Sequence, residues 1–259
     1  MDQKDILRTA LEQSAIDYGC TAEDFFRCEP VAVQSIPHPD ARKYLTLPFA
    51  CSLCSYGNNV VASTSGELQE SVLAFLKKYP PEHCFETPNM YALNEILQSH
   101  GLKVCFMAEY FLPELDLLQP LTCPYELRLL TQKDFSDLYL PEWSNALCEK
   151  RKHLDVLAVG AYDRDKLIGL AGCSKDCDTM WQIGVDVLPA YRKQGVAAAV
   201  TSHLALEIIR HGKVPFYCAA WSNIKSVRNA LKCGFRPAWV EITAKSIEYV
   251  NSINDEGTH

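Results

Sequence analysis

The hydrophobic pattern changes its period within residues 180–208. In MWQIGVDV, residues 180–187, large apolar side chains alternate with polar or small ones, which predicts a half-buried strand. After Pro189, the apolar residues recur every fourth position, which predicts a helix that starts near Gln194 or Gly195. The four apolar positions of this helix are Val196, Val200, Leu204 and Ile208. We expect Gly212 to form its left-handed cap.

The remainder of the second half is predicted from the same two periods. Residues 125–130 indicate a short strand, and Thr131 with Asp134 forms a capping-box pair that predicts a helix next. The stretch VLAVGAYDRDKLIGLAGCS predicts a hairpin that turns at residues 163–166. PFYCAAW predicts a strand, SNIKSVRNALKCG a helix stopped by Gly234, and FRPAWVEIT a last strand. The predicted order is strand, helix, hairpin, strand, helix, strand, helix, strand.

The first half has weaker patterns. CSLCSYGNNVVAS predicts a strand pair, GELQESVLAFLKKY and PNMYALNEILQSHG predict helices, and LKVCFMAEYF predicts a strand. This succession partly repeats the order of the second half. We interpret the first half as a degenerate copy of the same fold, with a separate α+β cap as the alternative.

The length of the chain predicts two domains. It has 259 residues, and a domain usually has roughly 100 to 200. Pro113, Pro120 and Pro124 interrupt any long helix between the halves, so we place the boundary near residues 118–124. The prediction is an α/β protein with a smaller domain over 1–120 and a second domain over 121–259.

The charge of the chain is acidic and unevenly spread. The net charge of -7 argues against a nucleic-acid partner, which normally requires a basic surface. Residues 1–124 carry a net -8 and residues 125–259 a net +1, so an anion would bind more easily in the second half. The acidic first half would steer a cationic molecule toward the protein, although solubility alone also explains it.

The sequence shows no pattern of export or membrane insertion. The amino terminus is charged throughout, and the uncharged stretch 45–66 contains proline, glycine and serine, as strands and turns do. We expect a soluble cytoplasmic protein. The twelve cysteines are then expected to be reduced and mostly buried. The alternative is a metal site formed by Cys51, Cys54, His83 and Cys84.

The loop RKQGVA, residues 192–197, has the chemistry of an anion site. Backbone amides at a helix start are unpaired and point outward, and the helix dipole favours a negative charge there. Gly195 allows a phosphate to approach the backbone, while Arg192 and Lys193 add positive charge. The chain has neither a P-loop motif nor G-x-G-x-x-G. A basic loop before a closely packed helix is the alternative.

Two segments resemble the GCN5-related N-acetyltransferase (GNAT) family. R-K-Q-G-V-A is similar to its pyrophosphate signature [RQ]-x-x-G-x-[GA], and NIKSVRNALKCGF, residues 223–235, is similar to its second conserved segment. WSNALC, SKDCDTMWQIGVDV and PFYCAAWSN resemble the subgroup that includes zwittermicin A resistance acetyltransferases. The general resemblance covers about residues 125–245.

The resemblance implies a mixed, mostly antiparallel twisted sheet flanked by helices. The strands 180–187 and 216–222 would separate, with the pantetheine arm of acetyl-CoA between them. The residues implied in acetyl-CoA binding are Val185, Val187, Arg192, Lys193, Gln194, Gly195, Val196, Ala197, Asn223 and Ser226. On the helix after Asn223, the row Lys225, Arg228 and Lys232 would meet the 3'-phosphate or simply face solvent.

The implied reaction is direct attack of an amine on the acetyl thioester. The family often has a glutamate where this chain has residues 181–183, so the only carboxylate of that strand is Asp186. Asp186 is a candidate base, with a strand-end hydrogen bond or pairing with Arg192 as the alternative. Glu142 and Asp155 are weaker candidates.

The group that would protonate the leaving thiolate also differs from the family pattern. The family often has a tyrosine where this chain has Ala230, so Tyr217 or Ser222 would replace it, or the thiolate would leave unaided. Residues 143–145 fall where the family has its substrate loop. We expect an acetyl-CoA-dependent N-acetyltransferase for a primary amine of a small molecule, such as an antibiotic or amino metabolite. A CoA-binding sensor without activity is the alternative; no metal is predicted, and monomer and homodimer are both open.

Overall fold

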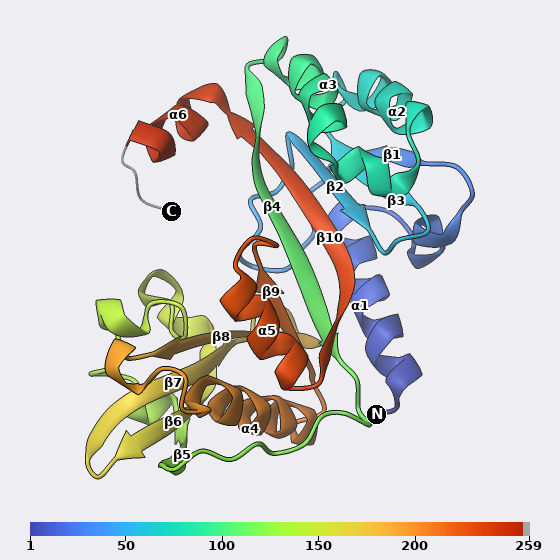
Figure 1. Ribbon diagram of the computed structural model, residues 1–259. Coiled ribbons are helices and arrows are strands. Elements are labelled where there is room, and N and C mark those ends of the chain that lie inside the picture. The colour runs from blue at the N-terminus through green and yellow to red at the C-terminus, as the bar shows by residue number, and fades with distance from the viewer. Residues whose placement is uncertain (256–259) are drawn as a thin grey trace. The chain divides into compact units, whose positions relative to one another are not determined.

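The computed structural model describes residues 1–255, which form two compact units (Figure 1). Unit 1 consists of Met1–Ala10 and Tyr110–Pro237. Unit 2 consists of Leu11–Glu109 and the segment from Ala238 onward. Both units are therefore discontinuous in sequence, whereas the predicted domains 1–120 and 121–259 are contiguous. The last four residues of the second predicted domain lie outside the described residues.

Unit 1 is built on a mixed sheet. The strand order is β4-β9-β8-β7-β6-β5, with three antiparallel pairs from β5 to β8 and the parallel pair β8–β9. The strands are β4 (Leu102–Pro113, in unit 1 from Tyr110), β5 (Glu126–Thr131), β6 (Asp155–Asp163), β7 (Lys166–Ser174), β8 (Met180–Val187) and β9 (Val214–Ala219). The hairpin β6–β7 and the strand β8 confirm the periods read from the sequence. β9 ends at Ala219, three residues before the predicted Ser222.

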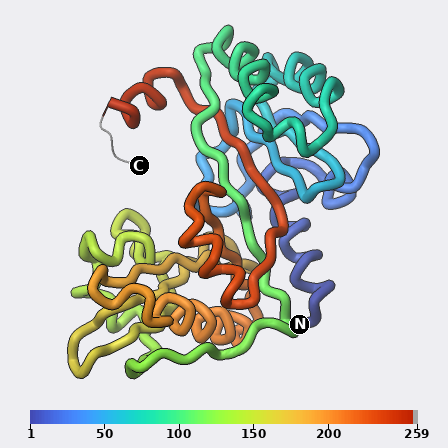
Figure 2. The backbone as a smooth tube through the Cα atoms, in the orientation of Figure 1, coloured from blue at the N-terminus to red at the C-terminus, as the bar shows by residue number. Residues whose placement is uncertain are grey.

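Helix α4 (Val196–Arg210) covers one face of this sheet. Its predicted apolar stripe is confirmed: all four side chains are buried against residues of β6, β7 and β8. A Cβ built on Gly169 in β7 would lie 2.5 Å from the Val196 side chain, so the glycine allows the helix to approach the strand closely. Gly212 follows the helix with φ 70°, as predicted for its cap. The backbone passes from β8 through a short loop into α4, and later from β9 into α5 (Ile224–Lys232) (Figure 2).

The helix predicted after Thr131 is wrong. The capping bond forms, because the Thr131 N–H donates to Asp134 Oδ2 at 2.8 Å, but only a short 3-10 turn follows. The segment up to β6 has three such turns: η3 (Gln132–Asp134), η4 (Pro141–Trp143) and η5 (Glu149–Leu154). Pro141 supplies no N–H, and the N–H groups of Asn145 and Ala146 donate to a carboxylate of β8 instead of to carbonyls of a helix.

Unit 2 contains the sheet order β1-β3-β2-β10. The strands are β1 (Val31–Gln34), β2 (Cys51–Ser55), β3 (Val60–Thr64) and β10 (Phe235–Ser246, in unit 2 from Ala238). The predicted hairpin is confirmed: β2 and β3 pair antiparallel, and Gly57 in their connection has φ 97°. The predicted helices are α2 (Gln69–Lys78) and α3 (Thr87–Gln98), which pack with β2 and β3 in one core. Whether this unit is a degenerate copy of unit 1 stays a prediction.

Besides β1 and the turn η6 (Pro189–Tyr191), four elements have no counterpart in the prediction. They are α1 (Gln3–Tyr18), η1 (Ala22–Phe26), η2 (Pro81–Phe85) and α6 (Ile247–Asp255). Charged residues recur along α1 and dilute its apolar stripe, although Ile6, Ala10 and Tyr18 are buried. Within the described residues, no helix is both long and apolar enough to cross a membrane.

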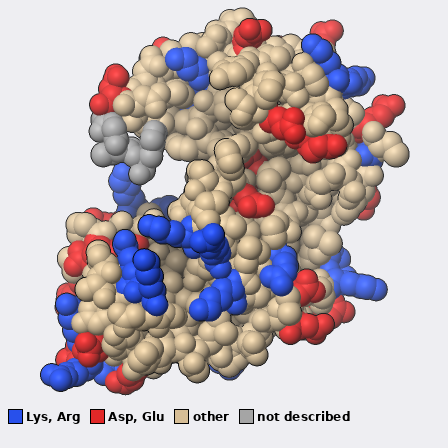
Figure 3. Space-filling view, viewed as in Figure 1, with Lys and Arg blue, Asp and Glu red and all other residues tan. Residues whose placement is uncertain are grey.

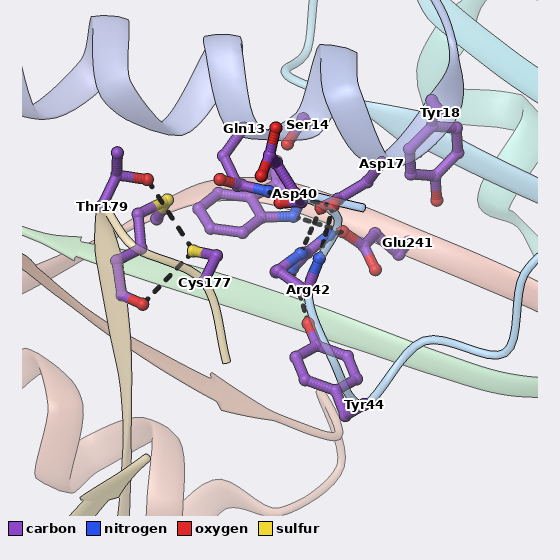
Figure 4. A network of polar contacts seen from close by, with 12 residues as sticks. Gln13, Ser14, Asp17, Tyr18, Asp40, Arg42, Tyr44, Cys177, Thr179 and Glu241 are labelled. Atoms are coloured by element: carbon purple, nitrogen blue, oxygen red, sulfur yellow. Dashed lines mark hydrogen bonds and ion pairs between the residues drawn. The ribbon is translucent and has the colours of Figure 1, made fainter. Parts of the chain in front are cut away.

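Unit 2 also buries an ionic cluster. The Arg42 guanidinium contacts Asp17 through Nε and Glu241 through Nη2, the latter at 2.7 Å (Figure 4). Tyr44 accepts from Arg42 Nη1, and the Trp239 indole donates to Glu241 Oε1 at 2.8 Å. The three ionic side chains are at most 4% exposed. The cluster thus joins α1, the segment before β2 and β10 within this unit.

Within residues 1–255, the cysteines form no disulfides, and those of the candidate metal site are buried. All twelve cysteines are free thiols, and Cys51, Cys54 and Cys84 are buried. His83 is about half exposed, with Nε2 3.8 Å from Glu86. In the described part of the chain, no three His, Cys, Asp or Glu side chains gather closely enough to hold a metal ion.

Candidate functional site

The parallel strands β8 and β9 separate partway along their length. Their register pairs Met180–Ile183 with Val214–Tyr217 and ends at Ile183 and Tyr217. β8 continues to Val187 and β9 to Ala219. The part of β8 beyond Ile183 lies outside this pairing with β9, and it contains Val185 and Val187, whose binding of the cofactor stays a prediction.

The loop after β8 has the backbone geometry of an anion site. Gly195 is the N-cap of α4 with φ 83°, and Lys193 also has a positive φ of 63°. The helix begins at Val196, as predicted, so the N–H groups of Val196 and Ala197 belong to its first turn and have no intrahelical acceptor. A Cβ on Gly195 would lie 3.4 Å from the nearest atom, so the positive φ, more than lack of space, requires glycine.

Side chains of this loop hold its shape. Arg192 Nε donates to the Val187 carbonyl at 3.1 Å, and Gln194 Oε1 accepts from the Tyr125 hydroxyl at 2.6 Å. Gln194 Nε2 also donates to the Ala190 carbonyl at 3.2 Å. Arg192 and Gln194 of the predicted loop 192–197 are therefore hydrogen-bonded to other residues of the protein. Arg192 and Lys193 remain exposed and positively charged beside the helix start.

The start of α5 faces the same region of the chain. Asn223 is its N-cap, and its side chain accepts from the Ser226 N–H at 3.3 Å. Lys225, Arg228 and Lys232 are all exposed on this helix. Lys and Arg side chains gather on the face of unit 1 that carries α5 and α4 (Figure 3). Contact of this row with the 3'-phosphate stays a prediction, with a solvent-facing row as its alternative.

Tyr217 points from β9 toward α5. Its hydroxyl lies 2.7 Å from the hydroxyl of Ser226, and the ring is only 2% exposed. Burial raises the pKa of Tyr217 above its ordinary value of 10.0, so this phenol keeps its proton at neutral pH. Ala230, where the family often has a tyrosine, is fully buried.

Asp186 on β8 binds the segment between η4 and η5. Oδ2 accepts from the N–H groups of Asn145 at 2.8 Å and Ala146 at 3.0 Å, and Oδ1 accepts from Asn145 Nδ2 at 2.7 Å. Arg192, the alternative partner read from the sequence, instead donates to Val187. Asp186 therefore makes hydrogen bonds at the end of its strand, which was the alternative to its role as a base.

Two glycines, missed by the sequence reading, allow this segment to lie on the sheet. Gly172 in β7 and Gly184 in β8 are directly paired. A Cβ on Gly184 would lie 1.8 Å from the Asn145 carbonyl oxygen, and one on Gly172 would lie 2.1 Å from that of Ala146. Their spacing in the sequence gave no signal, because the partner segment is 26 residues or more away along the chain.

The other candidate bases lie in different surroundings. Glu142 is exposed on η4. Asp155 is 1% exposed at the start of β6, which is separated from β8 by β7, and its Oδ2 accepts from the Cys148 N–H at 2.9 Å. Burial raises the pKa of Asp155 to about 6. At the level where the family often has a glutamate, Gln182 places Nε2 2.9 Å from the Cys218 sulfur on β9.

A family model described as "Acetyltransferase (GNAT) family" matches residues 124–235. This range contains the loop, the separation of β8 and β9, and α5. Together with the mixed sheet and its flanking helices, the match shows that this part of the chain has a GNAT-like fold and is similar to the GNAT acetyltransferase family. Among curated proteins, no match is found.

Solved structures similar to this chain include several acetyltransferases. A putative GNAT acetyltransferase from Novosphingobium aromaticivorans is 19% identical, with a TM-score of 0.42 over 56% of this chain and 66% of that one. A GCN5-related N-acetyltransferase-like protein from Streptococcus suis is 19% identical, with a TM-score of 0.44 over 62% and 69%. The aminoglycoside N-acetyltransferase AAC(6')-Iy in complex with CoA is 18% identical, with a TM-score of 0.34 over 46% and 92%.

Proposed function

We propose that unit 1 binds acetyl-CoA and transfers its acetyl group to a primary amine of a small molecule. The observation that carries this proposal is the left-handed Gly195 at the start of α4, placed directly after a strand whose edge is open beyond Ile183. The N–H groups of the first turn would hold the pyrophosphate, and the β8 edge near Val185 would hold the pantetheine arm. Asn223 and Ser226 would border the arm from α5.

Catalysis in this proposal is mainly positioning. Holding the amine against the thioester carbonyl removes the entropic cost of bringing two molecules together. The amine nitrogen attacks the carbonyl carbon, the nitrogen loses a proton to water, the carbon–sulfur bond breaks, and the coenzyme leaves as a thiolate. An alkylamine with a pKa near 10.4 must first lose a proton, which costs about 4.6 kcal/mol at pH 7.

Tyr217 is our candidate for protonating the departing thiolate. Its support is the position of its hydroxyl, 2.7 Å from the Ser226 hydroxyl at the start of α5. For proton removal from the amine, water beside Gln182 takes the place that a glutamate has in many relatives. Asp186 enters this proposal as a hydrogen-bond acceptor for residues 145 and 146 and not as the base.

The acceptor is proposed to be a small cationic amine, such as an amino-containing antibiotic or an amino metabolite. Two features support this: the resemblance to the subgroup of zwittermicin A resistance acetyltransferases, and the net charge of -8 over residues 1–124. Neither distinguishes one amine from another.

A second function is favoured by one observation. The middle of β8 carries Trp181, Gln182 and Ile183 and no carboxylate, so the chain lacks the acid–base group that many relatives use. A protein that binds acetyl-CoA without transferring the acetyl group, as a sensor would, fits this feature.

The experiment that separates the two is a thiol-release assay. The purified protein is incubated with acetyl-CoA and with spermidine, glucosamine, kanamycin or a lysine peptide, and each product is checked by mass spectrometry for one added acetyl group. Amine-dependent thiol release supports the transferase. Tight acetyl-CoA binding without release by any amine supports the sensor, and absence of binding overturns both.

A further inference from the structure

We propose that Asp186 is a positioning residue that fixes residues 144–147 against β7 and β8 as a rigid wall of the amine site. The effect on turnover rests on the proposed acetyl transfer. The fixed wall itself depends only on the contacts described here.

The carboxylate uses both oxygens for this purpose. Oδ2 accepts from two successive backbone N–H groups, of Asn145 and Ala146, and Oδ1 accepts from the Asn145 side chain. Hydrogen bonds to a charged acceptor are stronger than neutral ones. Three such bonds from two neighbouring residues determine both the position and the direction of this short segment. Both carboxylate oxygens are thus occupied by donors of this segment.

The sheet side of the segment is fixed by shape. The Asn145 and Ala146 carbonyls lie over Gly184 and Gly172, where any side chain would collide with them. Trp143, Ala146 and Leu147 are buried beside this contact. The segment is therefore held on one face of the sheet, by hydrogen bonds to Asp186 and by close contact over the two glycines.

The wall lies next to the open edge of β8. Gln182, Gly184 and Asp186 alternate with the core-facing residues of β8, so they share the face that residues 145 and 146 cover. An amine that approaches the thioester from this face meets the edge of the segment near Gln182. Releasing the segment should therefore weaken amine binding, while the bond-making step and the pyrophosphate loop stay intact.

The test uses Asp186→Asn and Asp186→Ala in the full chain, with Asp165→Asn in the exposed β6–β7 turn as the matched control. Hydrogen exchange is measured for the peptide that contains Asn145 and Ala146, and CoA affinity by calorimetry. Steady-state kinetics use acetyl-CoA with spermidine, glucosamine or kanamycin, whichever the wild type acetylates fastest. Gly184→Ala serves as a second, independent way to displace the segment.

We expect roughly tenfold or faster exchange at residues 145–146 in both Asp186 variants and in Gly184→Ala, with CoA affinity unchanged. We also expect KM for the amine to rise about tenfold or more, with kcat within about threefold and an unchanged pH profile. Unchanged exchange overturns the inference even if no amine is acetylated. A large loss of kcat together with loss of the acidic limb of the pH profile also overturns it, since this identifies a base. Failure of the wild type to bind CoA would instead overturn the proposed function.

Discussion

The hydroxyl groups of Tyr217 and Ser226 lie 2.7 Å apart, and they connect the end of the β8–β9 pairing with the first turn of α5. Tyr217 is the last residue of β9 that pairs with β8, so its side chain lies at the level where the two strands begin to separate. Ser226 is bound through its backbone to the N-cap Asn223. The proposed acetyl transfer assigns this phenol the protonation of the departing thiolate.

Tyr217→Phe removes the phenol and retains the ring. We expect kcat for amine-dependent thiol release to fall about 100-fold, the lower range for loss of a general acid, with little change in acetyl-CoA affinity. Stopped-flow detection of the released thiol measures this. Tyr162→Phe, a half-buried tyrosine on β6, is the control. An unchanged kcat would show that the thiolate leaves without this proton donor.

The basic row on α5 gives a prediction about the 3'-phosphate. Replacing Lys225 and Arg228 together by Ala should weaken CoA binding about fivefold or more, because exposed ion pairs contribute up to roughly 1 kcal/mol each. The same double variant should bind dephospho-CoA as the wild type does. Calorimetry with both ligands makes the comparison. If the double variant loses the same affinity for CoA and for dephospho-CoA, or loses none, the row does not contact the 3'-phosphate and only faces solvent.

The buried cluster of unit 2 predicts a large effect on stability. Arg42→Ala leaves Asp17 and Glu241 as buried carboxylates without their cation, so the free energy of unfolding should fall by about 3 to 5 kcal/mol. Urea unfolding followed by circular dichroism measures this. Arg8→Ala, whose side chain is 65% exposed, should change stability by less than about 1 kcal/mol. Similar midpoints for both variants would contradict the role given to Arg42.

Asp155 predicts a pH dependence of stability in unit 1. The pKa of this carboxyl is about 6 in the folded protein and near 3.8 when unfolded, because burial disfavours its charge. Between these values the folded state binds more protons, so this group stabilises the fold below pH 3.8 and loses that contribution as the pH rises to about 6. The change is about 3 kcal/mol. Asp155→Asn should remove this part of the slope, and identical wild-type and variant profiles would contradict it.

Strong periodicity explains what the sequence predicted well. The four alternating apolar residues of β8 and the four stripe residues of α4 pack into one core, so the local pattern and the tertiary environment agree. The loop at Gly195 could also be predicted, because a glycine placed just before a clear helical pattern is a local signal.

Contacts between distant residues explain what the sequence did not predict. Only a 3-10 turn follows Thr131, and further along the same segment the N–H groups of Asn145 and Ala146 donate to Asp186, 40 or 41 residues later. The charged helix α1 is stabilised by burial of residues such as Tyr18, not by a clear repeat. Unit 2 combines segments that are far apart in the sequence, because residues Val240–Thr243 of β10 pair with β2, which lies about 190 residues earlier. No local pattern encodes such pairings.

Acetyl-CoA affinity of Gly195→Val tests the central claim most directly. Gly212→Val is the matched control, because Gly212 has φ 70° at the other end of α4 and open space around it. Both variants should lose similar stability from the left-handed backbone, roughly 1 to 2 kcal/mol. We predict that Kd for acetyl-CoA, measured by calorimetry, rises about tenfold or more for Gly195→Val alone. A folded Gly195→Val protein with the wild-type Kd would contradict the account.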